Sequence, residues 1–131
     1  MAEVNKVAAI IIQDKKLLIA KDKGEEVFFI IGGKMEPGET EIETLHREVR
    51  EELNCEITKH EPFAEFDTLN HDKTKTLHAS CYLAELQGTP TAGEEIQEIT
   101  WIDRNYKQKG IKLGNLLEEN IVPELIKKGL L

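Results

Sequence analysis

The chain has 131 residues, with 25 acidic against 17 basic side chains and a formal net charge of −8. This balance argues against a protein that holds duplex nucleic acid, because such proteins neutralise phosphates with lysine and arginine. The length suits one domain, typically of roughly 100–150 residues, and the hydrophobic residues, 40% of the chain, gather in runs that exclude disorder. We therefore expect residues 1–131 to form a single domain.

No stretch of the sequence predicts export or membrane insertion. The longest apolar run, residues 7–12, has six residues, whereas a membrane-spanning helix needs about 20. The first six residues lack the apolar core of a secretory signal. Cys55 and Cys81 stand in no metal-binding or redox spacing, so we expect them to be buried as small hydrophobic residues. A cytoplasmic protein is the resulting expectation.

The N-terminal part of the chain predicts β-structure. Residues 7–12 form a continuous β-branched and apolar run, which is typical of a strand buried on both faces. A polar turn over residues 13–16 leads to residues 17–20, the expected hairpin partner. Residues 27–31 form another strand-like run that a pair of glycines should end, and a loop should then extend from Gly33 to Glu39.

A helix is predicted to begin directly after this loop. Thr40 with Glu43 three residues later forms a capping-box pattern. Asn54 is a suitable end, because asparagine tolerates the left-handed conformation that follows many helices. One stripe of apolar side chains falls at helical spacing and should pack on the core: Ile42, Leu45, Val49 and Leu53.

The second half of the chain predicts more strands and a second helix. The strand-like stretches are residues 57–67, 76–86 and 96–102. A polar loop over residues 103–112 leads to a helical pattern over residues 113–128, which Pro123 should kink or split. Strands interrupted by a helix and followed by another predict an α/β domain in which helices cover a mixed sheet.

The predicted first helix carries an unusual cluster of acidic residues. Glu48, Glu51 and Glu52 are spaced i, i+3 and i+4, so their side chains lie on one face of the helix and repel one another. A hard divalent ion such as Mg²⁺ or Mn²⁺ prefers oxygen ligands of this kind. The alternative is an ordinary acidic helix face in contact with solvent.

The residues around this cluster resemble the signature of the Nudix hydrolases. Gly33 is followed after five residues by Glu39, and after seven more by the run REVREE over residues 47–52. Asn54 and Cys55 depart from the pattern, in which a glycine and an aliphatic residue stand at these positions. Both substitutes serve the same structural purpose, a helix end and a small hydrophobic residue. The resemblance implies the Nudix fold, with a mixed sheet sandwiched between helices (α/β/α).

The resemblance also implies a role for each matching residue. The three clustered carboxylates would hold one to three Mg²⁺ or Mn²⁺ ions, and Gly32 would add a backbone carbonyl to the metal ligands. Arg47 would orient the carboxylates from behind, with Glu39 as its partner. Many family members also have a late acidic residue before a strand that bears an aromatic residue. Glu95 matches that position better than Glu94 and would complete the metal site, unless it is only an acid on an exposed loop.

The family's chemistry is the attack of water on a diphosphate, assisted by metal ions that neutralise its oxygens. A carboxylate takes the proton from that water, and the residue that does so differs between family members. Glu48 is our preferred candidate here, with Glu51 and Glu52 as alternatives.

Candidates for contact with the substrate lie outside the acidic cluster. Lys34 follows the two glycines and Lys21 ends the second predicted strand, so each could reach a phosphate group as a point charge. Phe28 and Phe29 should point to opposite faces of an extended strand. One should belong to the core while the other stacks on a base, and we take Phe28 as the candidate for stacking.

The sequence therefore predicts a MutT-like pyrophosphohydrolase that converts a nucleoside triphosphate, or a related nucleoside diphosphate derivative, to the monophosphate and pyrophosphate. Its partners would be a small nucleotide and Mg²⁺ or Mn²⁺, without duplex nucleic acid or membrane, and the protein would be a monomer or a homodimer. The alternative is a Nudix-fold module that binds a nucleotide without hydrolysing it. Such modules typically lose carboxylates that this chain retains.

Overall fold

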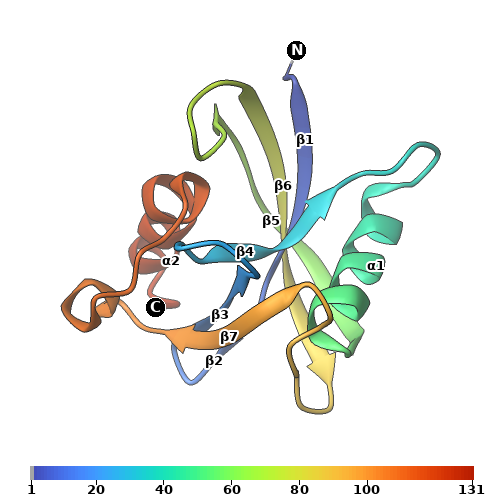
Figure 1. Ribbon diagram of the computed structural model, residues 1–131. Helices are drawn as coiled ribbons and strands as arrows, with labels where there is room; N and C mark the ends of the chain where they lie inside the picture. Colours follow the sequence, from blue (N-terminus) through green and yellow to red (C-terminus); the bar gives the residue numbers. More distant parts are fainter. Residues whose placement is uncertain (1) are drawn as a thin grey trace.

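The computed structural model describes residues 2–131. Figure 1 shows a curled sheet with α1 on one side and α2 on the other. The strands are β1 (Val4–Ile10), β2 (Ile12–Gln13), β3 (Lys16–Asp22), β4 (Phe29–Lys34), β5 (Glu56–Leu69), β6 (Thr76–Gln87) and β7 (Ile96–Ile102). The helical elements are α1 (Glu41–Leu53), the 3₁₀ turn η1 (Tyr106–Lys109), the π-helical turn η2 (Leu117–Ile121) and α2 (Val122–Lys127).

The strands form a mixed sheet. Their order is β2-β3-β4-β1-β6-β5, and β7 pairs with β3. The pairing of β1 with β6 is parallel, while β1 with β4, β3 with β4 and β3 with β7 are antiparallel. The predicted α/β fold, a mixed sheet between helices, is confirmed.

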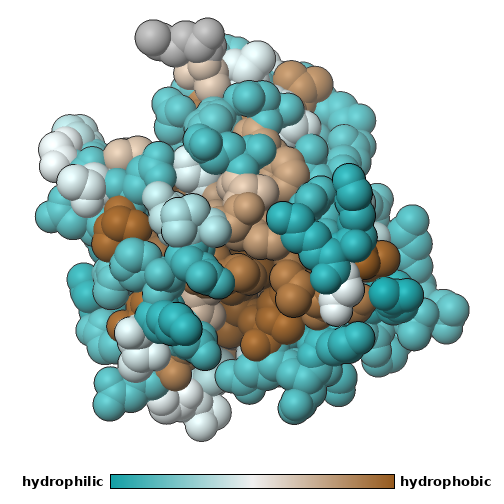
Figure 2. Space-filling view, turned by 180° about the vertical axis from the view of Figure 1, so that it is seen from behind, coloured by the Kyte–Doolittle hydropathy of each residue, from teal (hydrophilic) through white to brown (hydrophobic). Residues whose placement is uncertain are grey.

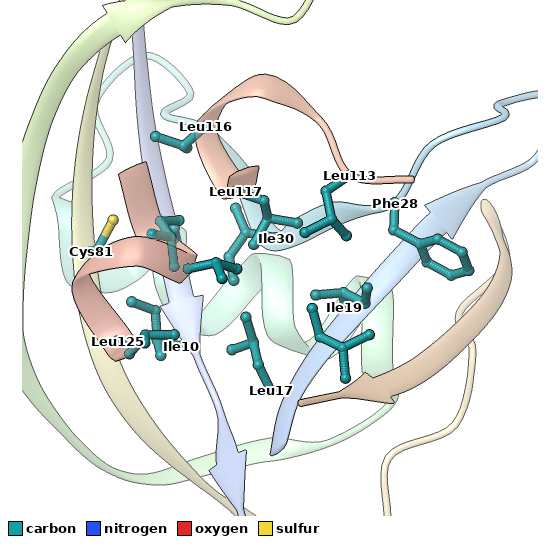
Figure 3. Close-up of a cluster of buried hydrophobic side chains, with 14 of the residues drawn as sticks. Ile10, Leu17, Ile19, Phe28, Ile30, Cys81, Leu113, Leu116, Leu117 and Leu125 are labelled. Carbon is teal, nitrogen blue, oxygen red and sulfur yellow. The ribbon is translucent and has the colours of Figure 1, made fainter. Parts of the chain in front are cut away.

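Strand β1 is buried on both faces, as its apolar run predicts. Ala8 and Ile10 face a core cluster that includes Leu117 and Leu125 from the C-terminal helical segment (Figure 3). Val7 and Ala9 face a second cluster, which includes side chains of α1. A strand with a hydrophobic cluster on each face has apolar residues throughout its buried part. Strand β1 therefore lies between the two clusters and separates the two helical layers.

On the face opposite to the view of Figure 1, hydrophilic residues surround a central hydrophobic area (Figure 2). Partly buried hydrophobic residues, among them Ile12, Phe63 and Leu83, border the first core cluster. No helix within residues 2–131 has both the length and the hydrophobicity to cross a membrane. Cys55 and Cys81 are free and buried, as expected.

Strand β4 corrects one prediction, because the two glycines continue the strand instead of ending it. β4 extends to Lys34, and Gly32 and Gly33 pair with Ala8 and Val7 of β1. Gly32 has a φ of 139°, and a β-carbon added there would clash with the backbone of Val7. Glycine is therefore required at this position for the close approach of β1 and β4.

The boundaries of α1 follow the predicted caps. The Thr40 hydroxyl accepts a hydrogen bond from the Glu43 backbone N–H at 3.1 Å, and the Glu43 carboxylate accepts one from the Thr40 N–H at 2.9 Å. Asn54 has a left-handed φ of 53° and ψ of 37°, and its N–H donates to the Arg50 carbonyl. These local bonds fix which residues of α1 face the core and which face outward.

The C-terminal segment differs from the predicted long helix. A π-helical turn, η2, directly precedes α2, and Pro123 lies in the first turn of α2. Since proline has no N–H to donate to the carbonyl four residues earlier, an α-helical hydrogen-bond pattern cannot continue through it. The predicted break at Pro123 therefore takes the form of a change in helix type. The predicted polar loop before this segment contains η1, whose Tyr106 is buried.

We predict that Asn54→Ala lowers the free energy of unfolding by about 1–2 kcal/mol, because alanine pays a steric penalty in the left-handed conformation. The amide of Asn54 also donates to the Thr91 hydroxyl at 3.1 Å, a contact that alanine removes. Asn54→Gly is the matched control, since it loses the same amide but adopts this conformation freely. Urea denaturation measures both variants, and an alanine variant as stable as the glycine variant would contradict the conformational explanation.

Candidate active site

Carboxylates from three parts of the chain line one cleft of about 520 Å³. They come from the end of β3, from α1 and from the loop before β7. The acidic lining residues are Asp22, Glu48, Glu51, Glu52, Glu94 and Glu95. The cluster predicted from α1 and the late acid predicted from the loop thus face the same space, and Asp22 joins them from a strand that the sequence did not connect with the site.

Arg47 forms hydrogen bonds with several residues at one side of this cleft. Its Nε and Nη2 donate to the two oxygens of Glu39 at 2.6 and 3.0 Å, and its Nη1 donates to Glu48 Oε1 at 2.8 Å. Nη2 also donates to the Lys34 carbonyl at 3.1 Å. The hydrogen bonds from Arg47 hold the pKa of Glu39 down to about 2. The guanidinium therefore connects the end of β4, the start of α1 and one carboxylate of the cleft.

Glu52 is the most enclosed of the carboxylates on α1. Its Oε1 accepts a hydrogen bond from the Gly32 backbone N–H at 2.8 Å. Burial raises the pKa of Glu52 to about 8, although the Gly32 bond opposes this shift. Burial also raises the pKa of Glu48, against the opposing effect of Arg47. Glu51 is the open member, with 58% of its side chain exposed.

The donor chemistry of the cleft fits a hard divalent cation. Carboxylates that lose solvation need a positive charge to stay ionised, and Mg²⁺ or Mn²⁺ supplies it through oxygen ligands alone. Within residues 2–131, no three such groups already converge on a single metal position. Glu48 and Glu52 each use Oε1 to accept a hydrogen bond, from Arg47 and from the Gly32 N–H respectively, so an ion would bind through the second oxygen of each carboxylate.

Two glycines bring neighbouring segments close to the acidic face of α1. A β-carbon on Gly33 would lie 2.6 Å from the Glu48 carboxylate. A β-carbon on Gly93 would clash with the Glu51 carbonyl, and the Gly93 N–H donates to the Glu52 carbonyl at 2.8 Å. This contact places the loop that bears Glu94 and Glu95 against the end of α1. The sequence predicted Glu95 only from the family pattern and had no signal for this packing.

A second cavity, of about 540 Å³, adjoins the cleft. Asp22 and Glu52 line both spaces. The second cavity is further lined by Lys6, Phe29 and Lys34. Lys34 was predicted to contact the substrate, whereas Lys6 was missed, although its position as a lone charge before an apolar run is visible in the sequence.

Two predicted substrate contacts are not brought to these cavities. Phe28 is only 8% exposed and lies in the core cluster near Leu113 (Figure 3). The phenylalanine that lines the second cavity is Phe29, so the position predicted for Phe28 is wrong: Phe28 is the core residue of the pair. Lys21 lies over the Phe28 ring at 5.2 Å and pairs with Glu98 at 3.6 Å, and it lines neither cavity.

The NUDIX domain profile matches residues 3–110 of this chain. The chain belongs to the Nudix family. It is 34% identical over 105 residues to a CTP pyrophosphohydrolase of Escherichia coli K12, covering 77% of this chain and 76% of that protein. It is 40% identical over 83 residues to the nucleoside triphosphatase NudI of an Enterobacter species, covering 56% and 59% of the two chains.

Solved structures agree with this assignment. The solution structure of the E. coli ORF135 protein superposes with a TM-score of 0.67 at 28% identity, over 92% of this chain and 84% of that one. A NUDIX hydrolase from Nitrosomonas europaea has a TM-score of 0.74 at 18% identity, over 96% and 87% of the two chains, and so supports the fold alone. The predicted Nudix fold and the predicted class of enzyme, a Nudix pyrophosphohydrolase, are confirmed.

We predict that Arg47→Ala lowers the free energy of unfolding by about 2 kcal/mol, the scale of a hydrogen bond to a charged group that is partly exposed. Arg47→Lys keeps the charge but cannot form the two-pronged bond to Glu39, so it should restore less than half of the loss. Guanidinium chloride would mask the charges, so urea denaturation is the measurement. Wild-type stability of the alanine variant would exclude the orienting role.

The ion pair between Arg47 and Glu39 also predicts how the free energy of unfolding depends on pH. The pKa of Glu39 is lowered from 4.5 to about 2 in the folded protein, so its contribution to stability is present above pH 4.5 and lost as the pH falls towards 2. The difference in stability between wild type and Arg47→Ala should therefore narrow as the pH falls through this window. A difference that is constant from pH 7 to 2 would show that Glu39 is not the partner that matters.

Proposed function

We propose that this Nudix enzyme hydrolyses a nucleoside triphosphate to the monophosphate and pyrophosphate, and that it depends on Mg²⁺ or Mn²⁺. The observation that carries the proposal is that the three carboxylates of α1, all retained, line one cleft. This cleft adjoins a cavity whose lining includes two lysines and an aromatic ring beside acidic residues. Two relatives named a CTP pyrophosphohydrolase and a nucleoside triphosphatase support this substrate class. The proposal treats residues 1–131 as one Nudix domain in the cytoplasm.

In this proposal Glu48, Glu51 and Glu52 hold the metal ions, with the Gly32 carbonyl and Glu95 as further ligands. When bound, the ions neutralise the diphosphate oxygens and lower the pKa of a coordinated water. The partly buried carboxylates suit this purpose, because a site with little competing water strengthens their attraction to a cation. Arg47 keeps Glu48 in place through the 2.8 Å bond.

The reaction itself needs a proton acceptor. Water attacks one phosphorus of the diphosphate, the bond from that phosphorus to the bridging oxygen breaks, and the proton of the water passes to a carboxylate. Glu48 is our candidate acceptor, because Arg47 donates to its Oε1 at 2.8 Å and so orients this carboxylate in the cleft. Glu51 and Glu52 are the alternatives, each within the same cleft.

The second candidate function is a module that binds a nucleotide without hydrolysing it. The complete set of carboxylates, with Arg47 bonded to Glu39 and Glu48, favours the enzyme. A panel of the eight common ribo- and deoxyribonucleoside triphosphates, assayed with Mg²⁺ or Mn²⁺, separates the two. We expect equal amounts of monophosphate and pyrophosphate from at least one of them, and no product in excess EDTA. Nucleotide binding without turnover under any of these conditions would favour the module.

We predict that Glu52→Gln lowers kcat by roughly a hundredfold or more, because the amide is a poor ligand for a hard cation. The fold should remain intact, since the side-chain oxygen of glutamine can still accept the hydrogen bond from the Gly32 N–H. Glu51→Gln should lose activity in the same way.

Glu61→Gln on β5 is the matched control, because this exposed acid lies outside both cavities. Steady-state kinetics with the best substrate of the panel, together with thermal unfolding, measures all three variants. Turnover at the wild-type rate by either α1 variant would remove that carboxylate from the metal site.

A further inference from the structure

No step of the proposed reaction uses Lys6. Lys6 lies on β1 directly before the buried run and lines the second cavity, half-buried. Its Nζ lies 5.9 Å from the centroid of the Phe29 ring. Across residues 2–131, no carboxylate comes close enough to form an ion pair with this ammonium group, although several other lysines have such partners. An ammonium that is partly desolvated and unpaired favours the arrival of an anion.

The sheet places a second lysine beside it. Lys6 and Lys34 are direct partners in the antiparallel pairing of β1 with β4, and both line the same cavity. Residues directly opposite each other lie on one face of the sheet with their β-carbons about 5 Å apart, and like charges in this arrangement destabilise the sheet. Burial adds to the cost and lowers the pKa of Lys6. A bound anion would turn this repulsion into attraction.

The cavity determines which anion fits. It shares Asp22 and Glu52 with the acidic cleft, and Glu25 lines it as well. A ligand that extends through both spaces therefore passes carboxylates where they meet, and Lys6 and Lys34 are the cations that line the second cavity. Phe29 provides an aromatic surface in this cavity, with the His71 ring at its edge, 5.6 Å between centroids. The volume of about 540 Å³ lies in the usual range for small-molecule sites, about 300–1,000 Å³. Cations beside an aromatic ring suit a phosphate attached to a nucleoside.

We propose that Lys6 and Lys34 together bind the phosphate that remains on the nucleoside, while the base lies against Phe29, so that this cavity holds the monophosphate half of the substrate. The inference rests on the proposed function. It adds Lys6 as a residue that contacts the substrate, and it divides the substrate between two sites, with the monophosphate half in the second cavity and the pyrophosphate half in the acidic cleft.

A purely structural role for Lys6 is the competing explanation. Glu52 and Glu48 lie close enough to raise the pKa of Lys6 against the effect of burial, so the lysine could serve only to balance the carboxylates. The two roles differ in what they require. Balancing the carboxylates needs no nucleotide, whereas the proposed role predicts binding of a nucleoside monophosphate even when EDTA has removed all metal.

The test is isothermal titration calorimetry of the metal-free protein with the four common ribonucleoside 5′-monophosphates and with the corresponding nucleosides. We expect at least one monophosphate to bind. Lys6→Gln should lower the affinity for it by about ten- to a hundredfold, the effect of losing a hydrogen bond to a charged group. Lys6→Arg should restore most of the affinity. Lys16→Gln, at the exposed start of β3, is the matched control and should bind as wild type does.

Titration with the nucleosides distinguishes loss of a phosphate contact from a general disturbance of the cavity. Lys6→Gln should leave the affinity for the nucleosides unchanged, because they carry no phosphate. Thermal unfolding confirms that each variant is folded. Equal affinity of wild type and Lys6→Gln for the monophosphate, or no saturable binding by wild type, would overturn the proposal. If the triphosphate panel shows turnover but Lys6→Gln binds the monophosphate as tightly as wild type does, only this inference fails. If the monophosphate binds through Lys6 but no triphosphate is hydrolysed, the proposed function fails instead.

Discussion

The active site depends on one guanidinium group. Arg47 donates hydrogen bonds to Glu39, to Glu48 and to the Lys34 carbonyl, and so connects the end of β4 with the start and middle of α1. Without a cation at this point, the negative side chains of α1 would repel one another, and Glu39 would keep only its contacts with the Glu36 N–H and the Thr44 hydroxyl. The planar, five-donor geometry of arginine allows three acceptors to be held at once, which lysine cannot reproduce.

A second constraint is the shortage of space around the acidic face of α1. Gly33 and Gly93 approach the helix so closely that a methyl group would not fit. Their contacts enclose Glu48 and Glu52, and the loss of solvation raises the pKa of both carboxylates. The protein thereby maintains an unfavourable arrangement of negative charge in the cleft, which a bound cation would relieve. In the proposed function, the crowding that destabilises the site is also the property that would attract the metal.

The adjoining cavity combines cations with carboxylates. Lys6 and Lys34 are partners across two neighbouring strands, and Asp22, Glu25 and Glu52 line the same cavity. In the proposed function, the two lysines would therefore offer positive charge to the part of the substrate that metal ions in the acidic cleft would not neutralise.

The sequence by itself determined the features that depend on neighbours along the chain: the caps of α1, the single face shared by its carboxylates, the buried β1 and the family. Helical periodicity and side-chain caps act over a few residues, so these could be read directly. Only the tertiary structure decided that Phe29 and not Phe28 lines the cavity, that Lys6 and not Lys21 reaches it, and that Asp22 joins the cleft. The alternation of a strand defines two faces without saying which one is buried, and strand register brings together residues that no local pattern connects.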